Sequence, residues 1–262
     1  MALFNDGPIN QQQDLADYEN GILDIANQEQ IDLDGKSALA QREIAAQLLT
    51  LLLRQETRSP YTNWIDPQDL LRRRTGVSDV VVTSALQQWH AMRTLAAVYR
   101  DAYNNQINDR YLKKWQEYQD LEREAKAQFY ATGVGLSGYW LPAPAAPSLT
   151  FEPGAGAGAQ YFVATTWVNQ AGQESAPSPH SQLSTAPGTQ LAVTAAPAAP
   201  PYATFWNAYV GTAPTALALQ NPTPLALGVT WIVPATLQTG VPPGSGQTPD
   251  WYVTDDHVMP RG

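Results

Sequence analysis

Residues 133–147 read GVGLSGYWLPAPAAP, and this stretch separates two halves of very different composition. Before residue 136 the chain carries 14 of its 15 Lys and Arg residues, 19 of its 24 Asp and Glu residues and only 3 of its 21 prolines. From residue 136 onward it carries 18 prolines and 12 of its 18 glycines. Proline removes a backbone N–H and clashes inside a helix, so the second half cannot be built from long helices. The composition therefore predicts an α-helical domain over residues 1–135, a linker over 136–147 and a β domain over 148–262.

Charge limits the partners that the chain can have. The formal net charge is −9, and the two halves contribute −5, from 14 basic and 19 acidic residues, and −4, from 1 basic and 5 acidic residues. Tight binding to nucleic acid needs Lys and Arg clustered on one face to neutralise phosphates. The only tight basic cluster is Arg72, Arg73 and Arg74. These arginines are consistent with a phosphate contact, with salt bridges on an assembly interface, or with a solvated helix end.

Cysteine content and the N-terminal residues indicate the cellular compartment in which the protein is made. The chain has no cysteine, which excludes disulfide frameworks and thiolate metal sites. The N-terminal residues MALFNDGPINQQQ lack both the positive leader and the apolar run of a secretory signal. No stretch reaches the roughly 20 apolar residues that a membrane-spanning helix needs. We therefore expect a soluble protein that is made in the cytoplasm and has no membrane partner.

Apolar residues in the first half recur with helical spacing. Steps of three and four between Leu15 and Ile25 predict a first helix, which Gly21 weakens. A second helix is predicted over SALAQREIAAQLLTLLLR (37–54), capped by Asp34 or a neighbour. A helix that is apolar on several faces is central in its domain or buried by a neighbouring subunit. The leucines that nearly encircle this helix are Leu48, Leu49, Leu51, Leu52 and Leu53.

Three further helices are predicted before the composition changes. Asp66-Pro67 predicts the start of a short helix that Gly76 ends. Long helices with aromatic stripes are predicted over residues 80–103 and 109–131. The polar turn between them is short, so they should form an antiparallel hairpin. The first half is therefore predicted to be an α-helical bundle that contains a long hairpin.

Short runs rich in β-branched and aromatic residues lie between the turn formers of the second half. They are Tyr161–Asn169, Leu191–Thr194, Ala203–Val210, Gly228–Val233 and Trp251–Thr254. Alternate residues of a run share one face, and no helical segment separates the runs. This pattern predicts an antiparallel β-sandwich, and the fold class is then α+β with two domains.

No constellation of catalytic or metal-ligating residues stands out in either half. Aromatic stripes along long helices are typical of a hydrophobic core rather than of a cofactor site. His90 has no Cys and no second His nearby, and we interpret it as a buried or interfacial residue. The stretch Gly154–Gly158 lacks the Lys-Ser/Thr ending of a phosphate-binding loop. We expect no enzyme activity, no metal site and no cofactor, with an enzyme whose site is unrecognised as an alternative.

The stretch TLAAVYRDAYNNQINDRYLKKWQEYQDLEREA (94–125) resembles the closing helical hairpin of phage head–tail connector proteins, which are also called adaptor or neck proteins. The shared features are a Tyr-Arg pair at the end of one helix, a polar turn, and spaced Lys, aromatic and Glu residues on the next helix. In this chain they are Tyr99-Arg100, Lys114, Trp115, Tyr118 and Glu122. In the second half, YFVATTWVNQAGQESAPSP (161–179) and FWNAYVGTAP (205–214) resemble strands of immunoglobulin-like or fibronectin III-like modules appended to virion proteins.

The resemblance implies a ring, typically a dodecamer, that docks under the portal of a capsid and faces the tail. Its partners are then further copies of the chain, the portal protein and a tail or tail-completion protein, and its location is the neck of the virion. DNA passes through such a ring without sequence-specific binding, and the family has no catalytic residue to carry over. A net-acidic subunit suits a conduit, because each phosphate contact would add affinity and friction.

We expect the subunit interface to lie in the helical half, because large interfaces combine an apolar core with a polar rim. The candidate interface residues are Leu48, Leu49, Leu52, Arg72, Arg73, Arg74, Trp89, Tyr99 and Trp115. The alternative function is that of a collar or decoration protein, or of a virion protein that binds a receptor or glycan through its β-sandwich. Exposed Trp and Tyr side chains on one edge of that domain would indicate this alternative.

Overall fold

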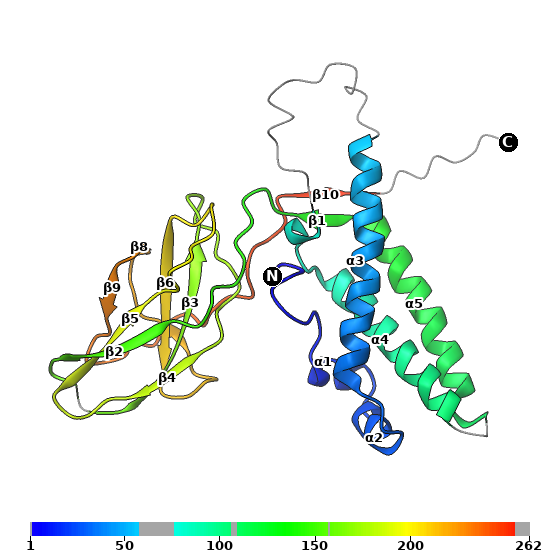
Figure 1. Cartoon of the computed structure of the whole chain (residues 1–262), viewed down its shortest axis with the longest axis horizontal. Coiled ribbons are helices and arrows are strands. Elements are labelled where there is room, and N and C mark those ends of the chain that lie inside the picture. The colour runs from blue at the N-terminus through cyan, green and yellow to red at the C-terminus, as the bar shows by residue number, and fades with distance from the viewer. Residues whose placement is uncertain (1, 58–75, 106–108, 157, 255–262) are drawn as a thin grey trace. The chain divides into compact units, whose positions relative to one another are not determined.

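The chain passes three times between two units in the computed structural model (Figure 1). The structure describes residues 2–57, 76–105, 109–156 and 158–254. The first unit, called the helical unit below, consists of Gly7–Leu136 and the segment that begins at Pro249. The second, called the β unit, consists of Ser137–Thr248 together with the N-terminal residues up to Asp6. The β unit is therefore inserted into the helical unit.

These boundaries differ from the division expected from composition. Residues 136–147, expected as a linker, are divided between the units: Leu136 belongs to the helical unit and Leu141 to the β unit, and both side chains are buried. The strand expected at Trp251–Thr254 within the β domain lies in the helical unit instead. Composition reports the content of a window and carries no information about which distant segment that window pairs with.

The described part of the helical unit contains five α-helices and two short 3-10 helices. They are α1 (Gln12–Tyr18), α2 (Ile22–Gln28), α3 (Leu33–Thr57), η1 (Val77–Asp79), α4 (Ser84–Asn105), η2 (Asp109–Tyr111) and α5 (Leu112–Thr132). The single helix predicted between Leu15 and Ile25 is divided into α1 and α2 near Gly21. Asp32 accepts the backbone N–H of Gly35 at 3.0 Å, so Asp32 caps α3. The helix predicted from Asp66 falls outside the described residues.

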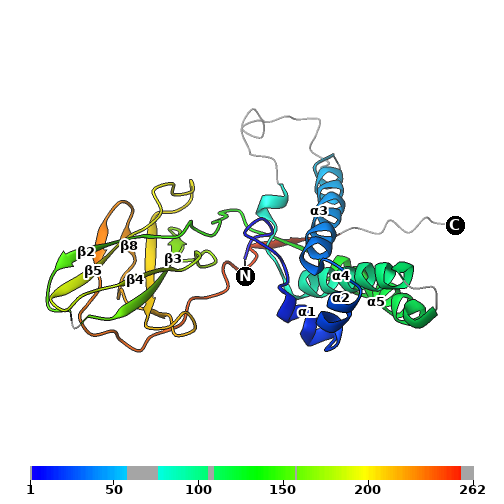
Figure 2. The same cartoon turned by 60° about the horizontal axis from the view of Figure 1, so that its bottom comes forward.

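Helices α4 and α5 form the predicted antiparallel hairpin, and α3 lies across one face of it (Figure 2). Aromatic rings fill the hairpin. Trp89 and Phe129 are buried with their ring centroids 5.3 Å apart, and Tyr99 stacks on Tyr118 at the same separation. The prediction that these stripes form a core is confirmed for the four residues above, whereas Tyr103 and Trp115 of the same stripes are only half-buried. Helix α4 begins later than predicted, after Thr83, because the chain before it is used as an extended segment.

A small sheet lies where the chain leaves the helical unit and returns to it. Strand β1 (Val134–Leu136) pairs antiparallel with β10 (Trp251–Val253), and Leu136 lies opposite Trp251. The other edge of β1 is also paired, because Val81 donates its N–H to the carbonyl of Gly135 at 2.9 Å. This ribbon joins segments that are more than 100 residues apart in the chain.

The β unit contains two antiparallel sheets. One has the strand order β2-β5-β9, and the other has the order β4-β3-β6-β7 with β8 also paired to β6. The strands are β2 (Ser148–Pro153), β3 (Gln160–Val168), β4 (Ser181–Ser184), β5 (Thr189–Thr194), β6 (Phe205–Gly211), β7 (Ala218–Leu219), β8 (Leu225–Ala226) and β9 (Thr230–Ile232). The predicted runs coincide with β3, β5, β6 and β9, whereas β2, β4, β7 and β8 were not predicted.

Strand register turns one face of each sheet onto a shared hydrophobic cluster. Val163 of β3 lies opposite Val210 of β6, and Trp167 lies opposite Trp206. All four side chains are buried in the cluster, and β5 of the other sheet adds Val193. The alternation predicted for these strands is thus confirmed.

Polar side chains hold the segment that follows β3. Ser175 and Ser178 each accept a backbone N–H of β3 with the hydroxyl oxygen at 3.0 Å. Asn169 accepts two N–H groups of the turn after it with Oδ1, and Glu174 accepts the hydroxyl of Tyr209 at 2.7 Å. Asn169, Glu174, Ser175 and Ser178 of the phrase NQAGQESAPSP therefore have structural roles.

Candidate functional site

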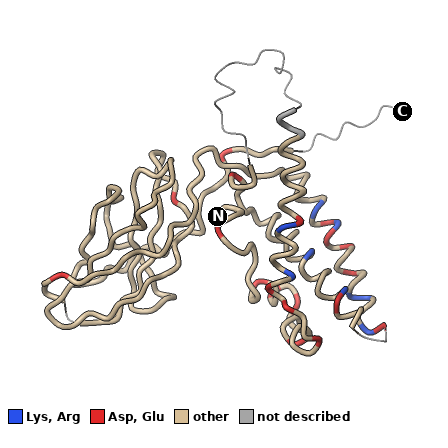
Figure 3. The backbone as a smooth tube through the Cα atoms, in the orientation of Figure 1, with Lys and Arg blue, Asp and Glu red and all other residues tan. Residues whose placement is uncertain are grey.

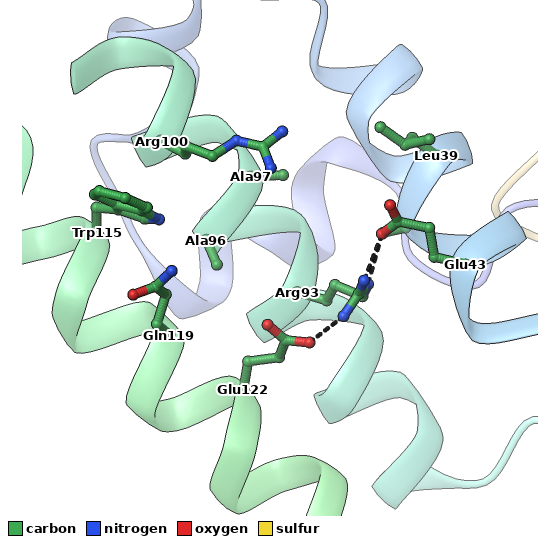
Figure 4. Close-up of a pocket in the computed structure, with 10 residues that line it drawn as sticks. Leu39, Glu43, Arg93, Ala96, Ala97, Arg100, Trp115, Gln119 and Glu122 are labelled. Carbon is green, nitrogen blue, oxygen red and sulfur yellow. Dashed lines mark hydrogen bonds and ion pairs between the residues drawn. The ribbon is translucent and has the colours of Figure 1, made fainter. Parts of the chain in front are cut away.

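A recess of about 110 Å³ opens between α3, α4 and α5 (Figure 4). Ala40 of α3 and Ala96 and Ala97 of α4 contribute to its lining, and their short side chains leave the hollow. Most of the remaining lining is polar or charged, and it comes from all three helices. The recess thus combines apolar surface with charge.

Arg93 of α4 joins the three helices beside this recess. Its Nε donates to Glu43 of α3 at 2.8 Å, and its Nη1 donates to Glu122 of α5 (Figure 4). Burial alone would lower the pKa of the guanidinium, but the two carboxylates hold that pKa above its ordinary value. The Arg93 side chain is only 23% exposed, so this network is less screened by water than an ordinary surface pair. Its role is to fix α3 and α5 on α4.

The rim of the recess also carries an aromatic ring and a second cation. Trp115 is half-buried and stacks on Tyr103, with the ring centroids 5.7 Å apart. Arg100 has a side chain that is 49% exposed and lies 3.6 Å from the carboxylate of the adjacent Asp101. Both Trp115 and Arg100 can therefore meet a group from outside the subunit.

One face of α3 remains exposed along the helix. Leu49 and Leu53, one turn apart, are each 45% exposed. Ala38 and Ala46 continue the exposed face toward the start of the helix, with Arg42 between them. Neighbouring apolar side chains of this kind on a helix surface are typical of a protein–protein contact.

His90 lies in the core behind this surface. Its Nε2 is 3.0 Å from the carbonyl oxygen of Ser37, and its Nδ1 is 2.9 Å from Nδ2 of Asn10. Because a carbonyl can only accept, Nε2 carries the proton and Nδ1 accepts from the amide. Burial lowers the pKa of His90 to about 4. The ring is therefore neutral near pH 7 and links α4 to α3 and to the chain before α1.

A second polar cluster joins the end of α1 to the hairpin. Glu19 accepts the hydroxyl of Tyr118 at 2.6 Å and the ammonium of Lys114 at 3.1 Å. Burial alone would raise the pKa of Glu19, but these two donors lower it below its ordinary value. Burial and the Glu19 carboxylate both raise the pKa of the Tyr118 phenol. Tyr118 therefore stays protonated as a hydrogen-bond donor, which is the behaviour of a structural group rather than of a base.

Charge is concentrated in the helical unit (Figure 3). The β unit has no Lys or Arg in its sequence, and its acidic residues are Asp6, Glu152 and Glu174. Asp6 accepts the N–H groups of Leu3 and Ala143 at 2.8 and 2.9 Å, and burial raises its pKa above the ordinary value. The β unit therefore lacks the cations that bind phosphate or carboxylate ligands.

The structure separates the candidate interface residues into three groups. Leu48, Leu52, Trp89 and Tyr99 are buried within the subunit and pack its own core, so they cannot form a surface for a partner. Leu49 and Trp115 are accessible on α3 and on the rim of the recess. Arg72, Arg73 and Arg74 lie outside the described residues. The recess itself was not predicted, because alanines from distant helices carry no signal in the sequence.

Comparison with protein-family models, with curated proteins and with solved structures gives no match to this chain. Within the described ranges, no group of three or more His, Cys, Asp or Glu side chains is placed to hold a metal ion. Among the helices that the structure describes, none has the length and apolar character to cross a membrane.

Proposed function

We propose that this chain is a structural subunit of a tailed-phage virion, a head-to-tail adaptor that assembles into a ring between the portal and the tail. The observation that carries the proposal is the exposed apolar face of α3 next to the recess, on a unit whose buried polar groups have structural roles. Such a surface suits contact with another protein. The resemblance of residues 94–125 to connector hairpins supports a contact between subunits of a ring.

A closed ring requires two different surfaces on each subunit, because every copy contacts its neighbours head to tail. The face of α3 with Leu49 and Leu53 is one such surface. The outer face of α5 is the other, since it alternates acidic and basic side chains that can pair across an interface, among them Lys113, Glu117 and Arg123. The net charge of −9 keeps the lumen of such a ring unattractive to DNA.

The β unit is an appended module in this proposal. Two antiparallel sheets that share one cluster, together with the strand phrases at 161–179 and 205–214, support an immunoglobulin-like or fibronectin III-like sandwich. Its lack of basic residues leaves it without groups that bind phosphate. In this proposal the module serves as collar decoration or as a contact with the tail.

Cryo-electron microscopy and mass photometry of the purified protein, alone and with portal-bearing capsids, test the proposal. We expect closed rings, and we expect the double variant Leu49→Glu/Leu53→Glu to remain monomeric. Because both leucines are half-exposed, their replacement should change the free energy of unfolding by only about 0.5 kcal/mol. Val241→Glu is the matched control, since Val241 is 71% exposed on the β unit, and it should assemble like the parent.

The proposal fails if the parent protein stays monomeric both in solution and with portal-bearing capsids. If the double variant still forms rings, the face of α3 with Leu49 and Leu53 is not the subunit contact. Loss of assembly in the Val241→Glu variant would show that the contact between subunits lies on the β unit instead.

A further inference from the structure

A second recess, of about 420 Å³, lies on the β unit and is separate from the surface discussed so far. Tyr139 and Tyr202 line it and meet edge to face, with their ring centroids 5.5 Å apart and their planes at 85°. Tyr139 is 59% exposed. The remaining lining includes Gln170, Pro201 and Thr204. A volume of this size lies within the roughly 300–1,000 Å³ of small-molecule sites.

A network of hydrogen bonds through Gln247 connects two of the segments that line this recess. Gln247, which is 2% exposed, donates from Nε2 to the carbonyl of Tyr139 at 2.9 Å and accepts the N–H of Leu141 at 2.6 Å. Gln247 Nε2 also lies 3.3 Å from Oε1 of Gln173, which in turn accepts from Asn169 at 2.8 Å. One buried amide thus ties the segment of Tyr139 to the turn that carries Gln170.

The ring of Tyr202 also contacts Trp140, with the ring centroids 6.4 Å apart and the planes at 81°. Pre-organised aromatic rings lose little conformational freedom when a ligand binds. The amide of Gln170 is exposed and makes no hydrogen bond within the part of the chain that the structure describes. It can therefore both donate to and accept from a ligand hydroxyl.

The absence of basic residues from the β unit limits the class of ligand that this recess can bind. The β unit contains no Lys or Arg, so phosphates, sulfates and carboxylates would find no cationic partner. Neutral aromatic faces next to a free amide match a molecule that has an apolar C–H face and a rim of hydroxyls. That description fits a neutral pyranose sugar.

We propose that the recess between Tyr139 and Tyr202 binds a neutral pyranose of a glycan, with the C–H face of the sugar on the exposed ring of Tyr139 and its hydroxyls on Gln170. This inference does not depend on the ring proposal, since the recess lies entirely within the β unit. It gives the β unit a role in surface recognition in addition to any structural role.

Saturation-transfer NMR on the full-length protein tests the inference. The probes are the methyl glycosides of glucose, galactose, mannose and N-acetylglucosamine at millimolar concentration, with glucuronic acid as the anionic comparison and an oligoproline peptide as the competing class. We expect transfer to at least one neutral glycoside. Tyr139→Ala should weaken its binding at least about tenfold, and Gln170→Ala about threefold.

Phe151→Ala is the matched control, because Phe151 is 53% exposed on β2 and does not line the recess. It should bind as the parent does. The inference is overturned by an absence of transfer to every neutral glycoside, by equal losses in Tyr139→Ala and Phe151→Ala, or by a preference for glucuronic acid. Binding of the oligoproline peptide in place of the sugars would identify a peptide groove and overturn it equally.

Discussion

At the scale of single residues, His90 shows how a polar group is accommodated in a helical core. Both ring nitrogens have partners, the amide of Asn10 and the carbonyl of Ser37. A protonated ring would place a charge in the core and would turn Nδ1 from an acceptor into a donor facing the Asn10 amide. Burial is thus combined with a hydrogen-bond pattern that suits only the neutral form, and the pKa falls to about 4.

His90 should make stability depend on pH below neutrality. The pKa of the folded state, about 4, lies below the unfolded value of 6.5. The contribution is therefore complete above pH 6.5 and is lost progressively as the pH falls from 6.5 toward 4. Over that window the free energy of unfolding should fall by on the order of 3 kcal/mol from this group alone. Urea unfolding at several pH values measures the loss, and NMR of the ring nitrogens measures the pKa directly; a His90 ring that protonates above pH 6 would contradict the expectation.

At the scale of elements, the ribbon of β1 and β10 depends on two glycines. Gly133 ends α5 with φ +95°, a conformation that favours glycine, and its N–H still bonds to the carbonyl of Phe129. Gly135 lies in a crowded place, where a Cβ would be 2.7 Å from Cγ of Pro249 and 3.2 Å from Cγ2 of Thr83. Gly133 thus ends α5, and Gly135 allows the returning chain at Pro249 to pack closely against β1.

Gly135→Ala should destabilise the helical unit by about 1–3 kcal/mol, because the added methyl group overlaps Pro249 in a packed site. Gly21→Ala is the matched control, since a Cβ there has no neighbour within 4 Å and the residue has an ordinary φ of −88°. That variant should be neutral or more stable by up to about 1 kcal/mol. Thermal and urea unfolding of both variants gives the comparison. Equal stabilities of the two variants would show that the ribbon is not tightly packed.

The elements also show what the sequence can and cannot predict. Apolar periodicity is a local property, and it correctly predicted the α4–α5 hairpin and the faces of β3 and β6. Pairing of β1 with β10 is a long-range property, so the strand near Trp251 was predicted as a strand but placed in the wrong unit. The two recesses are harder still to predict from the sequence, since they form where side chains from separate elements do not fill the space between them. Tyr139 and Tyr202, for example, are more than 60 positions apart.

At the scale of the whole molecule, the position of the β unit within the chain decides how the two units can be separated. The chain leaves the helical unit after Leu136 and returns at Pro249, and Asp250 donates its N–H to the carbonyl of Leu136 at 2.8 Å. The points of exit and return are therefore adjacent within the helical unit. Such an arrangement is tolerant of insertion and of removal, because a short turn can replace the inserted unit.

The first six residues complicate that separation. Leu3 and Phe4 are buried and belong to the β unit by their contacts, so a helical unit on its own has no core for them. A helical unit that is expressed alone should therefore start at Gly7 and exclude 137–248. Cutting the chain at residue 147 instead, as composition suggested, would remove β10 and leave one edge of β1 unpaired.

We accordingly expect a variant that starts at Gly7 and joins Leu136 to Pro249 by a short Gly- and Asn-containing turn to fold with a single cooperative transition. The turn closes a two-stranded ribbon whose register already exists, and a short loop costs less closure entropy than a long one. A second variant that keeps the β unit but ends at Thr248 should have a less stable helical unit, because Val134 and Leu136 lose the strand that pairs with them. Circular dichroism and hydrogen exchange at α4 and α5 distinguish the two. An unfolded excision variant, together with a truncated variant of unchanged stability, would mean that the helical unit depends on the inserted unit and not on its own returning strand.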